Sequence, residues 1–183
     1  MKNQLIAALV GGILLFVWQF LSWSVTGIHA DEMKYTDKQD AILQALSQQN
    51  LEEGTYFIPQ APPGSSSEQM QEHMKNSVGK PWAQIHYDTS MSGNMGMNMA
   101  RGFLIDLIAA FLLAWLLTKF QRLDLKTALL SSIAVGVIGY LTIPYLNSIW
   151  FETNSIGHLI DAIGSWGLVG LWMGWYLPKR LTA

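Results

Sequence analysis

The sequence predicts an α-helical membrane protein with four transmembrane helices and a small extracytoplasmic α+β insertion between the first and second helices. Half of the 183 residues are hydrophobic and 13% are charged, a composition typical of membrane proteins. Four apolar runs each approach or exceed the roughly 20 helical residues that cross a hydrocarbon core. Because a helix satisfies its own backbone hydrogen bonds in lipid, each run is expected to be a helix.

One apolar run lies near the N-terminus, and the other three follow one another in the last third of the chain. The first is expected over 5–25, within an N-terminal anchor 1–28. We expect it to remain uncleaved, because it is longer than the apolar region of a signal peptide, about 7 to 15 residues. Small residues at helical spacing predict close contacts between the helices. The other spans belong to a block 101–183 and are expected over 102–120, 125–146 and 157–177.

Basic residues flank the predicted spans at alternate ends, with Asp124 as the acid nearest to them. Cytoplasmic loops of membrane proteins carry an excess of lysine and arginine. We therefore expect both termini and the turn 119–126 in the cytoplasm, and the acidic segment 29–100 outside it. The flanking residues are Lys2, Lys119, Arg122, Lys126, Lys179 and Arg180.

The segment 29–100 is expected to fold as helix, strand, helix, strand. Two pairs of residues match the capping box that begins a helix, and two short runs are rich in β-favouring residues. The segment has few large apolar side chains, so its core is expected to be thin and to need support from the spans or from a partner. The capping pairs are Thr36 with Gln39 and Ser66 with Gln69, and the β-favouring runs are 55–58 and 82–87.

The chain also combines a short, positively charged start with two motifs in the polar segment and a terminal helical block. The motifs are Gly54-Thr55-Tyr56-Phe57-Ile58-Pro59, and Gly79-Lys80-Pro81 leading into Ile85-His86-Tyr87. In this arrangement the chain resembles, over most of its length, a family of small uncharacterised bacterial inner-membrane proteins. The resemblance implies a bacterial inner-membrane location and assigns no role to any individual residue.

Several function classes are excluded by what the sequence lacks. It contains no cysteine, which excludes disulfides and thiolate chemistry. It has no basic, aromatic stretch suited to a nucleic-acid backbone, so nucleic acid is excluded as a partner. It has no Ser-His-Asp order, HExxH motif or phosphate-binding loop, and we expect no enzymatic activity. Transport by this chain alone is not expected, because the cytoplasmic halves of the spans lack a polar path.

A methionine-rich segment follows the second predicted strand and includes Met91, Met95, Met97 and Met99. Thioether sulfur is a soft ligand, and such clusters outside the cytoplasm suit Cu(I). These four residues are therefore candidate copper ligands. Methionine is also an adaptable apolar filler, so packing is the alternative interpretation and implies no cofactor.

Five polar residues are expected at a similar depth near the outer ends of the spans: Gln19, Arg101, Asp106, His158 and Asp161. Ionisable groups within a span are costly and usually face the protein interior. His158 and Asp161 are three apart and share one helical face. The cluster indicates either an outward-facing pocket that binds a ligand or proton, or a pin in which Arg101 neutralises the acids.

The function expected from these observations is that of a structural or accessory partner in a membrane assembly. The expected partners are the lipid bilayer and other membrane proteins or a second copy of the chain. Two alternatives stay open. One is binding of copper or another soft metal by the methionine-rich segment, and the other is binding of a small ligand in a pocket at the outer helix ends.

Overall fold

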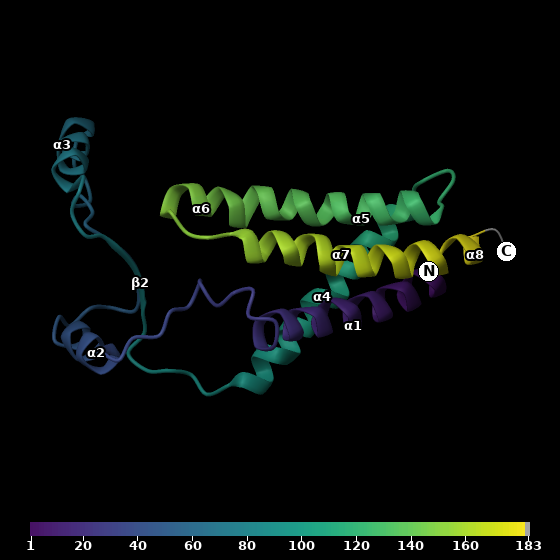
Figure 1. Cartoon of the computed structure of the whole chain (residues 1–183), viewed down its shortest axis with the longest axis horizontal. Helices are drawn as coiled ribbons and strands as arrows, with labels where there is room; N and C mark the ends of the chain where they lie inside the picture. Colours follow the sequence, from purple (N-terminus) through teal and green to yellow (C-terminus); the bar gives the residue numbers. More distant parts are fainter. Residues whose placement is uncertain (182–183) are drawn as a thin grey trace. The chain divides into compact units, whose positions relative to one another are not determined.

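The computed structural model describes residues 1–181, which fall into two compact units (Figure 1). The first unit combines Met1–Lys34 with the chain from Asn94 onward, and the second is Tyr35–Gly93. The second unit is shorter at both ends than the predicted insertion 29–100. Residues 29–34, which include a histidine and two acids, therefore belong with the long helices.

The first unit contains four helical segments that are long and apolar enough to cross a membrane, as the sequence predicts. The first two are α1 (Lys2–Ser24) and α4 (Met95–Leu117). The third joins α5 (Leu125–Tyr140), the π-helical turn η1 (Leu141–Tyr145) and α6 (Leu146–Phe151). The fourth is α7 (Ile156–Tyr176), which continues into the short α8 (Pro178–Leu181).

Two span boundaries differ from those predicted by more than one helical turn. The second span begins at Met95 rather than at 102. Residues 95–101 are more polar than the rest of the span, but they are compatible with a helix and continue it toward the N-terminus. The third span continues to Phe151 rather than ending at 146. Its Pro144 cannot donate a backbone hydrogen bond, and the π-helical turn accommodates the proline without ending the helix.

The helices of the first unit pack in the order α4, α1, α7, α5. Helix α1 contacts both α4 and α7, and α7 lies alongside α5 (Figure 1), whereas α4 and α5 make few contacts with each other. Small residues allow this packing, as predicted: a Cβ at Gly12 would lie 3.0 Å from the Cα of Leu107, and one at Gly170 3.0 Å from the Cα of Leu129. The fully buried residues include Ala7, Ala110, Ala128, Val169 and Met173.

The second unit contains α2 (Gln39–Ser47), β1 (Gly54–Ile58), α3 (Ser67–Ser77) and β2 (Ala83–Tyr87). The strands pair antiparallel, and this element order confirms the prediction. No residue of Tyr35–Gly93 is buried, so the unit has the thin core expected from its composition.

Only one of the two predicted capping boxes forms. Ser66 and Gln69 exchange both hydrogen bonds at the start of α3. The box predicted at Thr36 is wrong, because α2 begins after Lys38 and has no side-chain cap. The Thr36 hydroxyl accepts a bond from the Lys38 backbone N–H instead, a local turn that competes with capping.

Candidate functional site

The site lies where the chain leaving α1 folds back against the start of α7. The backbone turns at Gly27, whose φ of +69° suits glycine. Backbone bonds from Ala30 to Gly27 and from Glu32 to His29 then hold 27–32 as consecutive turns. These turns bury His29 to 4% exposure.

The start of α7 leaves room for the His29 ring. A Cβ at Gly157 would lie 2.8 Å from Nδ1 of His29, so a larger residue there would displace the ring. The side chain of Asn154 accepts a bond from the Ile156 backbone N–H and covers the beginning of the helix. Tyr140 of α5 contacts the hydroxyl of Ser155 at 3.1 Å and ties the third span to the same region.

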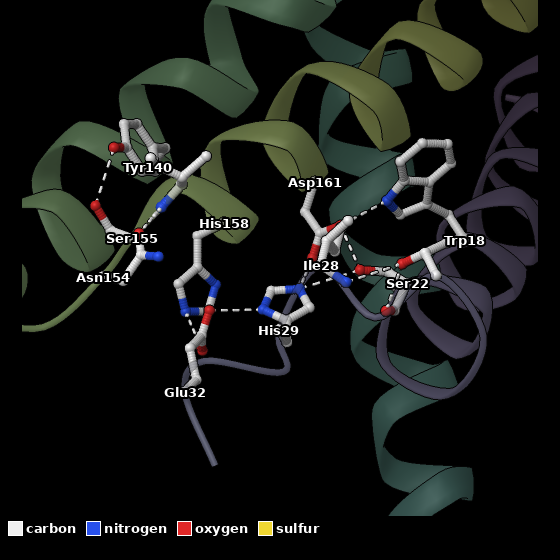
Figure 2. A network of polar contacts seen from close by, with 12 residues as sticks. Trp18, Ser22, Ile28, His29, Glu32, Tyr140, Asn154, Ser155, His158 and Asp161 are labelled. Atoms are coloured by element: carbon white, nitrogen blue, oxygen red, sulfur yellow. Dashed lines mark hydrogen bonds and ion pairs between the residues drawn. The ribbon is translucent and has the colours of Figure 1, made fainter. Parts of the chain in front are cut away.

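Asp161, on the second turn of α7, is held on both carboxylate oxygens (Figure 2). Its Oδ1 accepts hydrogen bonds from Trp18 Nε1 at 2.9 Å and from Ser22 Oγ at 2.6 Å. Its Oδ2 lies 2.8 Å from Nε2 of His29. Trp18 and Ser22 are on α1, and His29 lies in the turns that follow it. The carboxylate of Asp161 therefore joins α1, these turns and α7.

His29 lies between two carboxylates. Its Nδ1 is 2.7 Å from Oε1 of Glu32, and its Nε2 faces Asp161. The ring also stacks on Trp23, with centroids 4.0 Å apart and planes 1° from parallel. Burial of the ring opposes a charge, but the hydrogen bonds and charges of Glu32 and Asp161 outweigh it and raise the pKa of His29 above its ordinary value.

Glu32 extends the chain of contacts to a second histidine. Its Oε2 lies 3.1 Å from Nε2 of His158, so the order is Asp161, His29, Glu32, His158 (Figure 2). We call these four residues the His-carboxylate network. Exposure increases from 3% for the His29 side chain through 18% for that of Glu32 to 34% for that of His158, and the Asp161 side chain is 20% exposed. His29, His158 and Asp161 each offer one metal-ligating atom, and these atoms lie within 4.8 Å of one another.

The exposed end of the network opens on a cavity of about 680 Å³. Three carboxylates and one lysine contribute to its wall, together with polar groups from α6 and the loop before α7. Glu152, in the left-handed conformation that ends α6, is one of the carboxylates. The lining residues are Asp31, Glu32, Lys34, Pro144, Asn147, Glu152, Thr153, Asn154, Ser155 and His158.

The structure divides the five predicted polar residues. His158 and Asp161 belong to the network, whereas Gln19 and Asp106 meet on the side of α1 that faces α4, with Gln19 Nε2 3.0 Å from Asp106 Oδ1. Arg101 is exposed and forms no ion pair within residues 1–181. The expected pairing of Arg101 with the two acids is therefore wrong, and His29 is the partner of Asp161.

Asp106 is buried to 4% exposure, and its Oδ2 has no hydrogen-bond partner in the described part of the chain. A carboxylate within a span is costly, whereas an amide can still accept the bond from Gln19. We expect Asp106→Asn to leave the melting temperature in detergent unchanged or higher. A clear decrease would show that the carboxylate has a partner besides Gln19.

The structure does not gather the four methionines. Met95 and Met99 are one turn apart on α4, but Met97 lies on the opposite side of that helix, and all three are exposed. Met91 belongs to the other compact unit. A helix cannot turn three residues at this spacing toward one ion, so the described residues contain no sulfur cage at this segment.

Two network residues, His29 and Glu32, were missed by sequence reasoning. A signal was present, because His29 and Glu32 have the same three-residue spacing as His158 and Asp161. Both pairs also adjoin the predicted outer end of a span. Comparison of the chain with protein-family models, curated proteins and solved structures found no match.

Proposed function

We propose that this is a bacterial inner-membrane protein that binds a small cationic ligand in the cavity at the extracytoplasmic ends of its helices. The observation that carries the proposal is the acidic wall of that cavity. Asp31, Glu32 and Glu152 line it against the single lysine Lys34. Its volume of about 680 Å³ lies within the range of small-molecule sites.

The carboxylates of Asp31 and Glu152 are the reason to expect a ligand with a positive charge. Both side chains are exposed in the cavity wall, and neither has a hydrogen bond or ion pair in the described residues. Glu32 already bridges the two histidines. A cation entering the cavity could form ion pairs with these two carboxylates without breaking an existing contact, whereas an anion would be repelled by them.

The proposed orientation rests on charge at the opposite end of the first unit. Asn3 bonds the backbone of Arg180, and Gln4 bonds the hydroxyl of Thr118, so the start of α1, the short α8 and the loop after α4 share one end. The basic flanking residues are there, and the cavity is at the other end. The rule that basic flanks stay inside therefore supports a location of the cavity outside the cytoplasm. The bacterial inner membrane is inferred from the resemblance.

Orientation can be measured with reporter fusions. A reporter active only outside the cytoplasm should be active when inserted after Ser65 and inactive when fused after Arg122 or at the C-terminus. Activity after Arg122 would reverse the proposed orientation. A reporter active only in the cytoplasm, placed at the same sites, should give the opposite pattern and serves as the control.

Ligand binding can be tested by thermal shift on the detergent-purified protein in the presence of a chelator. A panel of small organic cations, with matched anionic and neutral compounds, should contain a cation that raises the melting temperature. The combined Asp31→Asn and Glu152→Gln variant should lose the shift, and Glu72→Gln, which removes an exposed carboxylate from α3, should keep it. The proposal fails if no cation stabilises the protein, or if the cavity variant is stabilised equally.

A role as an accessory partner in a membrane assembly is the second candidate. It is favoured by the open row of helices, in which α4 and α5 form the edges and make few contacts with each other. An edge helix leaves one face for another membrane protein or for a second copy of the chain. Cross-linking in native membranes through cysteines placed singly on α4 and α5 tests this, because the chain has no cysteine of its own.

A further inference from the structure

Two copies of one short pattern meet in the His-carboxylate network. His29 is followed three residues later by Glu32, and His158 three residues later by Asp161. The first pair lies in the turns after α1 and the second on the first two turns of α7. The packing of α1 against α7 turns both pairs toward each other, so two imidazoles and two carboxylates face a common space (Figure 2).

We propose that the network binds one divalent transition-metal ion of the Zn²⁺ class, with His29, His158 and Asp161 as ligands and Glu32 as the carboxylate that orients the two imidazoles. This inference goes beyond the proposed cationic ligand of the cavity and assigns a metal ion to the donors at and behind the cavity wall. Imidazole nitrogen and carboxylate oxygen are the ligands that Zn²⁺ takes in open sites. A purely carboxylate site would instead suit Mg²⁺ or Ca²⁺, and a thioether site Cu(I).

The spacing of the donors fits a site that closes on the ion. Zinc bonds to nitrogen and oxygen measure about 2.0–2.2 Å, which places neighbouring ligands of a tetrahedral ion about 3.4 Å apart. The three ligand atoms lie within 4.8 Å of one another, so only small side-chain movements would be needed to reach that spacing. The ion would replace the proton that a histidine nitrogen shares with a carboxylate oxygen.

The groups around the donors already hold them in place, as the outer contacts of metal ligands do. Trp18 and Ser22 bond Oδ1 of Asp161 and leave Oδ2 facing the network. Trp23 stacks on the ring of His29 and fixes its plane. Glu32 contacts both histidine rings, and a carboxylate in that position orients a ligating imidazole.

The cavity supplies the route by which an ion would reach the donors. His158 and Glu32 form part of its wall, whereas His29 and Asp161 are not among its lining residues. Asp31 and Glu152 lie on the same wall and would attract a cation toward His158 and Glu32. The open position of the site would face the cavity, where water or a second ligand could complete the coordination.

The test is metal binding by tag-free protein that has been stripped with a chelator. After equilibrium dialysis against Zn²⁺, elemental analysis should find about one equivalent per chain. His158→Gln keeps a side chain that can donate to Glu32 and removes the imidazole, and it should weaken binding by at least the roughly 10- to 100-fold that loss of an outer contact costs. Co²⁺ in place of Zn²⁺ should give a visible absorption band in the unaltered protein and none in His158→Gln.

The chain offers matched controls, because two of its four histidines lie in the second unit. His73→Gln and His86→Gln should each retain the zinc and the cobalt band. The melting temperature of each variant, measured without metal, shows whether the protein has remained folded. The proposal is overturned if zinc content stays near zero in the unaltered protein, or if His158→Gln binds zinc as tightly as the two controls.

The two proposals can fail separately. If no zinc binds while an organic cation still stabilises the protein through Asp31 and Glu152, the metal site is refuted and the cationic cavity stands. If zinc binds but no organic cation does, and if the combined Asp31→Asn and Glu152→Gln variant leaves zinc binding unchanged, the metal site stands without a wider ligand cavity. Absence of both kinds of binding would refute both.

Discussion

Replacing His29 by alanine is expected to lower the free energy of unfolding by about 3 kcal/mol. The ring is 3% exposed and lies between Glu32 and Asp161, so its removal leaves two partly buried carboxylates without the imidazole that they contact. The value is at the lower end of that known for breaking a buried ion pair, because the carboxylate side chains remain 18% and 20% exposed. Reversible unfolding in mixed micelles with a chelator present would measure it.

His86→Ala is the matched control for this change. His86 also contacts an acid, Asp88, at 3.3 Å, but both side chains are more than half exposed. An exposed pair contributes little, so the control should change stability by less than about 1 kcal/mol. If the two histidine variants are equally stable, the network does not join α1 to α7.

Substituting Gly164 by alanine is expected to have the second largest effect. Gly164 is on α7, and a Cβ there would collide with the six-membered ring of Trp18. The rigid indole cannot bend away, so α1 would have to shift and Trp18 would lose its hydrogen bond to Asp161. We expect a destabilisation of about 1–3 kcal/mol, the usual cost of overpacking a close contact.

Gly139→Ala is the control, because a Cβ at Gly139 meets no atom within 4 Å. It should leave the stability unchanged or slightly raised, since alanine favours the helix more than glycine does. The double variant Trp18→Phe with Gly164→Ala should recover part of the loss, because the smaller ring makes room for the methyl group. No recovery would mean that the collision is not the cause.

The sequence was sufficient for the four spans, since hydrophobic length alone identifies a helix that can cross a membrane. It was less reliable where a local exception governs the backbone. The third span was expected to end at 146, but the π-helical turn around Pro144 carries the helix on to Phe151. Thr36 had the spacing of a capping box, but its hydroxyl bonds a nearer backbone N–H. The π-helical turn and the Thr36 hydrogen bond both depend on local backbone geometry, which the residue types alone do not determine.

The site was only half predictable for a related reason. His158 and Asp161 share one helix, so their proximity follows from their spacing. The partner of Asp161 depends on which helix lies beside α7, and hydrophobicity does not specify that neighbour. Because α1 is the neighbour, His29 reaches Asp161 while Arg101 on α4 stays exposed. The adjacent residues Trp18 and Gln19 donate hydrogen bonds to different acids, Trp18 to Asp161 and Gln19 to Asp106.

The most direct test of this arrangement is a double-mutant cycle between His29 and Asp161 in metal-free protein. Asp161→Asn keeps an oxygen for Trp18 and Ser22 while removing the charge that faces His29. Unfolding free energies of the unaltered protein, His29→Ala, Asp161→Asn and the double variant should show a coupling of at least about 1 kcal/mol. Effects that add to within about 0.5 kcal/mol would contradict the contact on which the site depends.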